Sequence, residues 1–205
     1  MKSQPSQFRR FAVMDIETVA LDPNDEKGAL DAISGRVVCI GMLFDDGHEI
    51  KEVALTDENE SSLIKAFWNA IRPTDVLIGH NLLEFDLMFL RQRSWILGIK
   101  PTRTIDLRKY YSEDVIDTMQ LWSNWGFKKF VKLEELGDAL GCGCKTGHGT
   151  DVAQWWAVRD LDNIKAYCLH DVRLTYAVYC RLMYQHPRMA KPQTAADVVV
   201  LGKSA

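Results

Sequence analysis

The most constraining feature of this sequence is a carboxylate on the apolar side of a long C-terminal helix. Helical periodicity runs from about Asp151 to Tyr184, with a break expected near Asp160. At 3.6 residues per turn, one stripe carries Ile164, Cys168, Asp171, Thr175, Val178 and Leu182. Asp171 therefore faces the interior, where a carboxylate is costly without a cation, a metal ion or hydrogen-bond donors. The simplest partner is an arginine that forms a salt bridge with Asp171.

Two further side chains of this helix lie close to Asp171 in sequence. Tyr167 precedes Asp171 by four residues, so it lies on the same side of the helix one turn away. His170 is about 100° from Asp171 around the helix axis and falls in a small polar sector. We therefore expect Tyr167 to accompany Asp171 and His170 to be a solvated helix residue. Taken alone, Tyr167 also fits an ordinary core aromatic.

A second group of carboxylates follows an early apolar strand, FAVMDIET (11–18). Asp15 and Glu17 are two residues apart, so in a strand they project to the same face. Side by side they repel each other unless a positive charge lies between them. Divalent cations such as Mg²⁺ and Mn²⁺ prefer oxygen ligands and suit such a pair. The alternative is a strand that simply runs into an acidic loop.

A third acidic position lies in GHNLLEFD (79–86). A short apolar strand ends at His80-Asn81, and a helix is expected to begin near Asp86. Taken alone, Asp86 fits a helix cap or an acidic residue of the first turn, which the helix dipole favours.

The remaining pattern predicts one α/β domain with strands early and helices late. The Asp46-Gly47 dipeptide marks a tight hairpin, and RTIDL (103–107) is expected to add a short strand. We place a flexible lead-in at residues 1–8, a single domain at 9–186 and a weakly patterned tail at 187–205. A chain of 205 residues suits one sizeable core.

Composition limits the setting and the partners. The formal net charge is −3, so a nucleic-acid partner would be held by local basic patches. The five cysteines are odd in number and two lie in the helical pattern, which argues against a disulfide framework. We expect a cytoplasmic protein without a signal peptide, and no apolar run is long enough to cross a membrane.

Taken together, the three acidic segments resemble a known nuclease family. D-x-E at a first strand, N-x-x-x-F-D at a strand-to-helix junction and Y-x-x-x-D on a late helix occur in this order. They are similar to the three motifs of the DEDD 3′-5′ exonucleases, including the proofreading domain of family B DNA polymerases. The resemblance covers residues 10–184. One branch of that family has a histidine where this chain has Ala166, and the other has a tyrosine where it has Tyr167. The resemblance is therefore to the tyrosine branch, DEDDy.

The resemblance implies a fold, a reaction and a set of residues. The fold is ribonuclease H-like, with a mixed sheet of about five strands flanked by helices. Asp15, Glu17, Asp86 and Asp171 would bind two Mg²⁺ or Mn²⁺ ions, and Tyr167 would orient the attacking water. The substrate would be single-stranded DNA or frayed 3′ ends. An exoribonuclease and a non-catalytic nucleic-acid-binding subunit are the alternatives, and a polymerase or repair partner is compatible with either.

Three residues are candidates for contacting the substrate. Asn81 and Phe85 stand beside Asp86 and can meet the terminal nucleotides, although Phe85 fits a core position equally well. Lys145 lies in the glycine-rich stretch GCGCKTGHG (141–149), where flexible backbone can approach a phosphate.

The same stretch contains Cys142, Cys144 and His148. Their C-x-C spacing is shorter than is usual for zinc, and a clear fourth ligand is lacking, so we do not predict a structural zinc site. Asp117 precedes a helical pattern and is expected at a helix N-terminus, outside the metal-binding set.

A last segment combines lysines with phenylalanines. Lys128, Lys129 and Lys132 alternate with Phe127 and Phe130, an arrangement that can hold phosphates and stack bases. Phenylalanines at this spacing are more often core residues beside solvated lysines, and we favour that interpretation.

Overall fold

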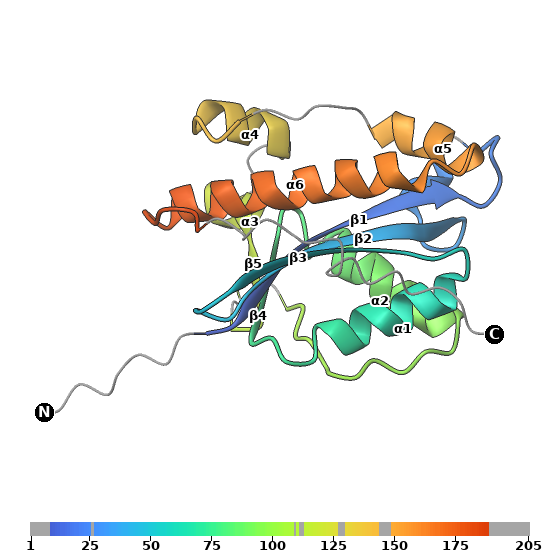
Figure 1. Cartoon of the computed structure of the whole chain (residues 1–205), viewed down its shortest axis with the longest axis horizontal. Coiled ribbons are helices and arrows are strands. Elements are labelled where there is room, and N and C mark those ends of the chain that lie inside the picture. Colours follow the sequence, from blue (N-terminus) through green and yellow to red (C-terminus); the bar gives the residue numbers. More distant parts are fainter. Residues whose placement is uncertain are drawn as a thin grey trace, which may run out of the picture.

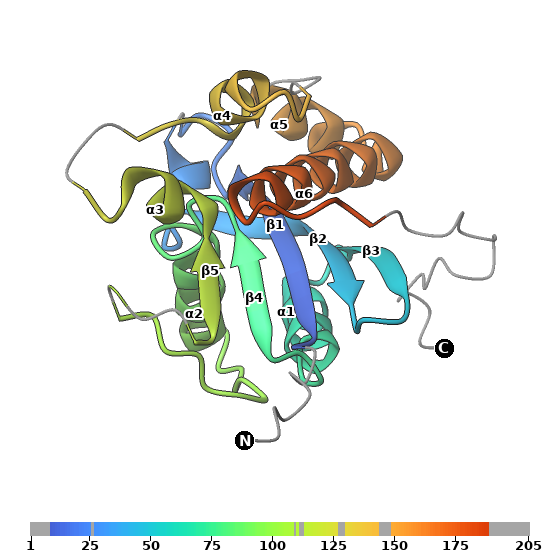
Figure 2. The same ribbon diagram turned by 90° about the vertical axis from the view of Figure 1, so that its left-hand side faces the viewer.

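A mixed five-stranded sheet runs through the middle of the molecule (Figure 1). The computed structural model describes residues 9–25, 27–108, 110, 113–126, 130–143 and 149–188, with the backbone alone at 149–150. Figure 2 shows the strands side by side in the order β3-β2-β1-β4-β5. Their bounds are Phe11–Ala20 for β1, Gly35–Asp45 for β2, Ile50–Thr56 for β3, Val76–Gly79 for β4 and Val115–Asp117 for β5.

The first three strands form the antiparallel half of the sheet, and β4 and β5 add a parallel half beside β1. The predicted hairpin joins β2 to β3. Its turn depends on Asp46, whose Oδ1 accepts hydrogen bonds from the amides of His48 and Glu49, both at 2.8 Å. Gly47 has φ +89°, a conformation that glycine adopts without strain.

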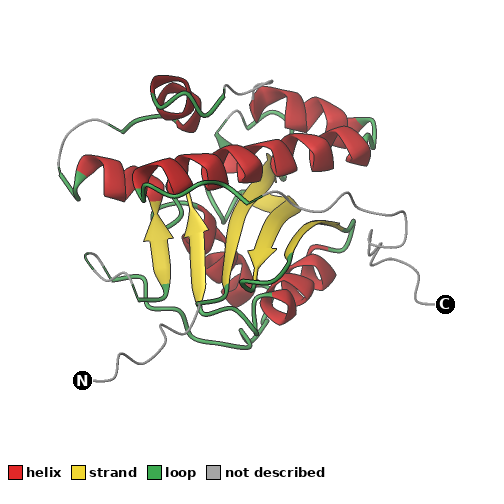
Figure 3. Cartoon of the chain, turned by 60° about the vertical axis from the view of Figure 1, so that its left-hand side comes forward, coloured by secondary structure: helices red, strands yellow, loops and turns green. Residues whose placement is uncertain are grey.

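Helices cover both faces of the sheet (Figure 3). On one face lie α1 (Glu60–Ala70) and α2 (Asp86–Ile96). The other face is crossed by α6 (Leu161–Leu182), which contacts β1, β2, β3 and β4. The helices α3 (Thr118–Ser123), α4 (Leu133–Ala139) and α5 (Gly149–Ala157) pack against α6, and a short 3₁₀ turn, η1 (Gly28–Leu30), follows β1.

Alternation along β1 decides which face each side chain reaches. Ala12, Met14 and Ile16 are buried in the core cluster that includes α1 and α2. Val13 and Val19 are buried with side chains of α6 on the opposite face. Because successive strand residues point to opposite faces, Asp15 and Glu17 also lie on the α6 side of the sheet.

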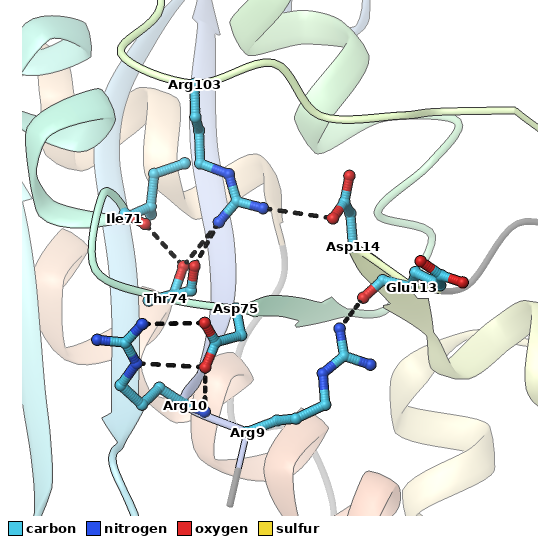
Figure 4. A network of polar contacts seen from close by, with 8 residues as sticks. All are labelled: Arg9, Arg10, Ile71, Thr74, Asp75, Arg103, Glu113 and Asp114. Atoms are coloured by element: carbon cyan, nitrogen blue, oxygen red, sulfur yellow. Dashed lines mark hydrogen bonds and ion pairs between the residues drawn. The ribbon is translucent and has the colours of Figure 1, made fainter. Parts of the chain in front are cut away.

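The starts of three strands are tied together by polar contacts (Figure 4). Arg10 pairs with Asp75 at 3.0 Å, which joins the beginnings of β1 and β4. Arg103 donates to the carbonyl of Thr74 at 2.6 Å and lies 3.6 Å from Asp114, directly before β5. Ion pairs and hydrogen bonds therefore hold this end of the sheet together.

The predicted α/β class, the early hairpin and the helical C-terminal part are confirmed. The expected strand at 103–107 is wrong. That segment is an extended connection with the Arg103 contacts above, and the fifth strand is Val115–Asp117, which pairs with β4. No described helix is both long and apolar enough to span a bilayer. The predicted lead-in at 1–8 and all but the first two residues of the predicted tail lie outside the described residues.

Candidate active site

The site begins where β1 and β4 stop pairing. Their ladder ends at Val13 and Ile78, so the β4 side of β1 is open beyond that point. The carboxylate of Asp86, the first residue of α2, fills the opening: its Oδ1 accepts a hydrogen bond from the Ile16 amide at 3.1 Å. Asp86 is thereby fixed against the backbone between Asp15 and Glu17.

The other edge of β1 is irregular at the same level. The register with β2 shifts between Glu17 and Thr18, since Glu17 faces Cys39 and Thr18 faces Val37. Val38 is therefore the extra residue of a bulge. Bulges bend a strand and increase its twist, and they are common beside active sites because they redirect side chains.

A glycine lets α6 approach the strand closely at this point. Gly41 of β2 faces Asp15, and a Cβ at Gly41 would lie 2.9 Å from Cys168 Sγ and 3.0 Å from Val172 Cγ2. A larger residue at Gly41 would have to displace Cys168 or Val172. The close approach places Cys168 Sγ 3.5 Å from the backbone oxygen of Asp15 and 3.8 Å from its Oδ2.

The predicted pair on α6 lies on the same buried side of the helix. Tyr167 and Asp171 flank Cys168 in sequence, and Asp171 is 3% exposed. The Tyr167 ring packs edge-on against Trp155 of α5, with centroids 5.7 Å apart. His170, expected to be solvated, is half-buried, because neighbouring elements pack along this helix.

Asp117 positions the loop that leads to Asp86. Its carboxylate caps α3 through the amides of Met119 and Gln120, as expected for a helix N-terminus. It also accepts the amides of Asn81 at 3.0 Å and Leu83 at 3.1 Å, in the loop between β4 and α2. Sequence reasoning missed this second role, since an N-cap aspartate gives no sign of which distant amides it will also bind.

Charge balance separates the site from the rest of the interior. Three other buried carboxylates have an arginine partner, namely Asp45 with Arg188 at 2.6 Å, Glu52 with Arg173 at 2.5 Å and Glu60 with Arg93 at 2.6 Å, whereas Asp117 accepts the backbone amides described above. Asp86 is 3% exposed, and no cationic side chain among the described residues pairs with it. Burial, followed by the nearby charge of Asp15, raises the pKa of Asp86 well above its usual range.

Several of these groups can serve one cation. One ligand atom each from Asp15, Glu17 and Cys168 lie within 4.8 Å of one another. The two carboxylates suit hard divalent ions. The buried Asp86 beside them has a charge that such an ion would compensate. The donor set therefore fits a divalent metal.

The candidate substrate contacts have mixed outcomes. Asn81 adopts φ +61° and lines a cleft of about 310 Å³ together with His80, Phe130 and Lys132. Phe130 is 70% exposed, so the expectation of a core phenylalanine is wrong at this position, because the ring lies on the rim of the cleft.

Phe85 is partly buried at the edge of the main core, with its ring 5.6 Å from that of Phe89. This placement agrees with the core interpretation. Lys145, Cys144 and His148 lie outside the described residues, as do Phe127, Lys128 and Lys129.

Comparison with known proteins gives a family for this chain. Residues 30–202 match the model of a family described as a predicted 3′-5′ exonuclease related to the exonuclease domain of PolB. The chain belongs to this family. The matched range includes Asp86, Tyr167 and Asp171 and begins after Asp15 and Glu17.

Two proteins to which this chain is similar are archaeal DNA polymerases. DNA polymerase 2 of Aeropyrum pernix is 25% identical over 194 residues, covering 85% of this chain and 23% of the polymerase. The family B DNA polymerase from Pyrobaculum calidifontis superposes with a TM-score of 0.66 at 20% identity, over 85% of this chain and 24% of the polymerase. The chain thus spans about a quarter of the length of these relatives. The superposition is consistent with the predicted ribonuclease H-like fold.

The raised pKa of Asp86 predicts a stability effect. We expect Asp86→Asn to stabilise the protein in chelator at neutral pH by about 1–3 kcal/mol, since asparagine keeps an acceptor for Ile16 without a buried charge. A pKa that is higher in the folded state favours folding below the unfolded value and loses that contribution as pH rises through the folded value. The gain over wild type should therefore be small near pH 4 and grow towards pH 8.

Thermal unfolding at several pH values measures this gain, because each kcal/mol shifts Tm by about 2–4 °C in a chain of this size. Glu60→Gln is the matched control. It removes a buried carboxylate that has an arginine partner, so it should destabilise the protein. A lower Tm for Asp86→Asn at pH 8 would contradict the electrostatic interpretation.

Proposed function

We propose that this chain is a metal-dependent 3′-5′ exonuclease that removes nucleoside 5′-monophosphates from single-stranded or frayed DNA. The observation that carries the proposal is the burial of Asp86 next to Asp15. Among the described residues, no cationic side chain pairs with Asp86. A cluster of this kind is unfavourable alone and favourable around divalent cations. Membership of an exonuclease family supports the same reaction.

Asp15, Glu17, Asp86 and Asp171 are the residues that we assign to hold two Mg²⁺ or Mn²⁺ ions. Bound ions of this kind lower the pKa of water and stabilise charge on a phosphate and its leaving oxygen. The chain contributes the rigid placement of its carboxylates. Asp86 is held by the Ile16 amide, and Asp15 by its strand opposite Gly41. Preorganised groups of this kind need little rearrangement during the reaction.

Tyr167 is assigned the task of orienting the attacking water, with Glu17 as its hydrogen-bond partner. A phenol has a reference pKa of about 10, so near neutrality it keeps its proton. In this form it can make hydrogen bonds to the water but is unsuited to act as the general base. The packing of Tyr167 against Trp155 restricts its ring. Ala166, at the position of the histidine in the other branch, is exposed. Both observations favour the tyrosine branch, DEDDy.

The 3′ end of the substrate is placed in the cleft beside Asn81. An exposed phenyl ring at Phe130 can stack a base, and Lys132 can approach the phosphate backbone. Phe85 and Lys145 are further proposed contacts. An RNA substrate is the alternative, because the distinction between RNA and DNA depends on contacts to the 2′-hydroxyl. Digestion of matched DNA and RNA oligomers, and a test for a polymerase or repair partner, would separate these possibilities.

Removing single carboxylates tests the catalytic assignment. Asp15→Ala and Asp171→Ala should each reduce the shortening of a 5′-labelled oligonucleotide in Mg²⁺ or Mn²⁺ by about 100-fold or more. Asp162→Ala is the matched control, since the Asp162 side chain is 97% exposed on the same helix and should be dispensable. Full activity in both site variants would refute the assignment. Binding without any cleavage in the wild type would favour a non-catalytic subunit.

The branch assignment predicts an order of effects on α6. Tyr167→Phe keeps the ring that packs against Trp155 and removes only the hydroxyl, so we expect slower cleavage with an unchanged fold. His170→Ala should leave the cleavage rate within a few-fold of wild type. Single-turnover rates and thermal unfolding measured on both variants provide the comparison. A larger rate loss from the histidine variant would exclude the tyrosine branch.

A further inference from the structure

A buried thiol lies among the carboxylates of the site. Cys168 Sγ is 3.8 Å from Asp15 Oδ2, and one oxygen of Glu17 falls within the same 4.8 Å cluster. Cys168 is 0% exposed, so its sulfur has no contact with solvent. A hard ion such as Mg²⁺ prefers oxygen ligands and binds sulfur weakly, whereas zinc and related ions bind thiolates strongly.

The spacing of these atoms suits a single zinc-like ion. Zinc lies about 2.3 Å from sulfur and about 2.1 Å from a carboxylate oxygen, so tetrahedral coordination places the two donors about 3.6 Å apart. The observed separation of 3.8 Å between Cys168 Sγ and Asp15 Oδ2 is close to that value. Little movement is needed for both atoms to reach one ion.

The sulfur is also held in place. Gly41 packs so closely that a Cβ there would lie 2.9 Å from Sγ, and α6 is anchored along the sheet on both sides of this contact. The thiol of Cys39, opposite Glu17 on β2, adjoins Cys168 from behind. A donor that is already ordered loses little conformational freedom when it binds an ion.

An independent observation calls for a cation at this position. Asp86 is buried next to Asp15, and no cationic side chain in the described part of the chain pairs with it, whereas Asp45, Glu52 and Glu60 pair with arginines. The site therefore has negative charge to be compensated whether or not the thiol takes part. The negative charge favours binding of a cation, and a sulfur ligand favours thiophilic cations over hard ones.

We propose that Cys168, with Asp15 and Glu17, forms a binding site for thiophilic divalent cations of the zinc class. Binding joins the metal to Sγ and releases the thiol proton to solvent, as coordination of a cysteine requires. The ion then occupies carboxylates that Mg²⁺ or Mn²⁺ would otherwise use, so zinc inhibits cleavage. The inhibition rests on the proposed exonuclease function, and the binding does not.

Cadmium is the direct probe, because a cadmium–thiolate bond has an ultraviolet charge-transfer absorption that carboxylates lack. The full chain with Cys142→Ser and Cys144→Ser serves as the background, which removes the thiols of the glycine-rich stretch. During titration with Cd²⁺, this absorption should rise until one equivalent of Cd²⁺ per protein chain has been added and then level off. Cys168→Ser should abolish it and weaken Zn²⁺ binding by about 10–100-fold, while Mg²⁺ binding changes less than about threefold.

Cys180→Ser is the matched control, since Cys180 is also buried on α6 and lies outside the cluster. It should keep the full absorption. Cys168→Ala provides a second variant, and thermal unfolding shows that each variant is folded. Absorption that is missing in the background protein, or that persists in folded Cys168→Ser and Cys168→Ala, would overturn the proposal.

The nuclease assay separates the two proposals. Zinc should inhibit Mg²⁺-supported cleavage at a lower concentration in the background protein than in Cys168→Ser. If cleavage is absent with every metal and the cadmium absorption still depends on Cys168, the exonuclease proposal fails and the metal site stands. If cleavage is normal and zinc inhibits both proteins equally, the thiol has no part in metal choice.

Discussion

The hydrogen bond from the Ile16 amide to Asp86 joins the parts of the site that lie farthest apart in sequence. It exists because β1 and β4 pair only as far as Val13, which leaves the Ile16 amide without a strand partner on that side. The first turn of α2 supplies the acceptor, and Asp117 holds the loop that leads to it. This backbone opening thus brings the first residue of α2 to the part of β1 that carries Asp15 and Glu17.

A contrast in electrostatics follows from this arrangement. The chain pairs three other buried carboxylates with arginines, as between Glu60 and Arg93, which stabilises the contact of α1 with α2. Among the described residues no arginine or lysine pairs with Asp86, so its charge has no cationic counterpart there. A ligand that binds only the folded state stabilises it in proportion to its concentration and affinity. A divalent cation would therefore contribute to stability here as well as to chemistry.

The sequence predicts most of the fold and the acidic positions, because helix spacing, the Asp46-Gly47 turn and the motif order are local patterns. It fails where long-range contacts decide. Residues 103–107 have strand-like composition, but β4 pairs with Val115–Asp117 instead. The loop contacts of Asp117 and the approach of Cys168 to Asp15 depend on packing between distant elements. The exposure of Phe130 likewise depends on a cleft that no local pattern shows.

The central claim is that the carboxylates at this end of the sheet hold a pair of divalent ions. Anomalous diffraction from crystals soaked in Mn²⁺, with a nucleoside 5′-monophosphate present, tests it most directly. The account predicts two manganese positions about 3.5–4 Å apart, in contact with Asp15, Glu17, Asp86 and Asp171. Manganese bound elsewhere, with these four carboxylates left without metal at saturating concentration, would contradict it.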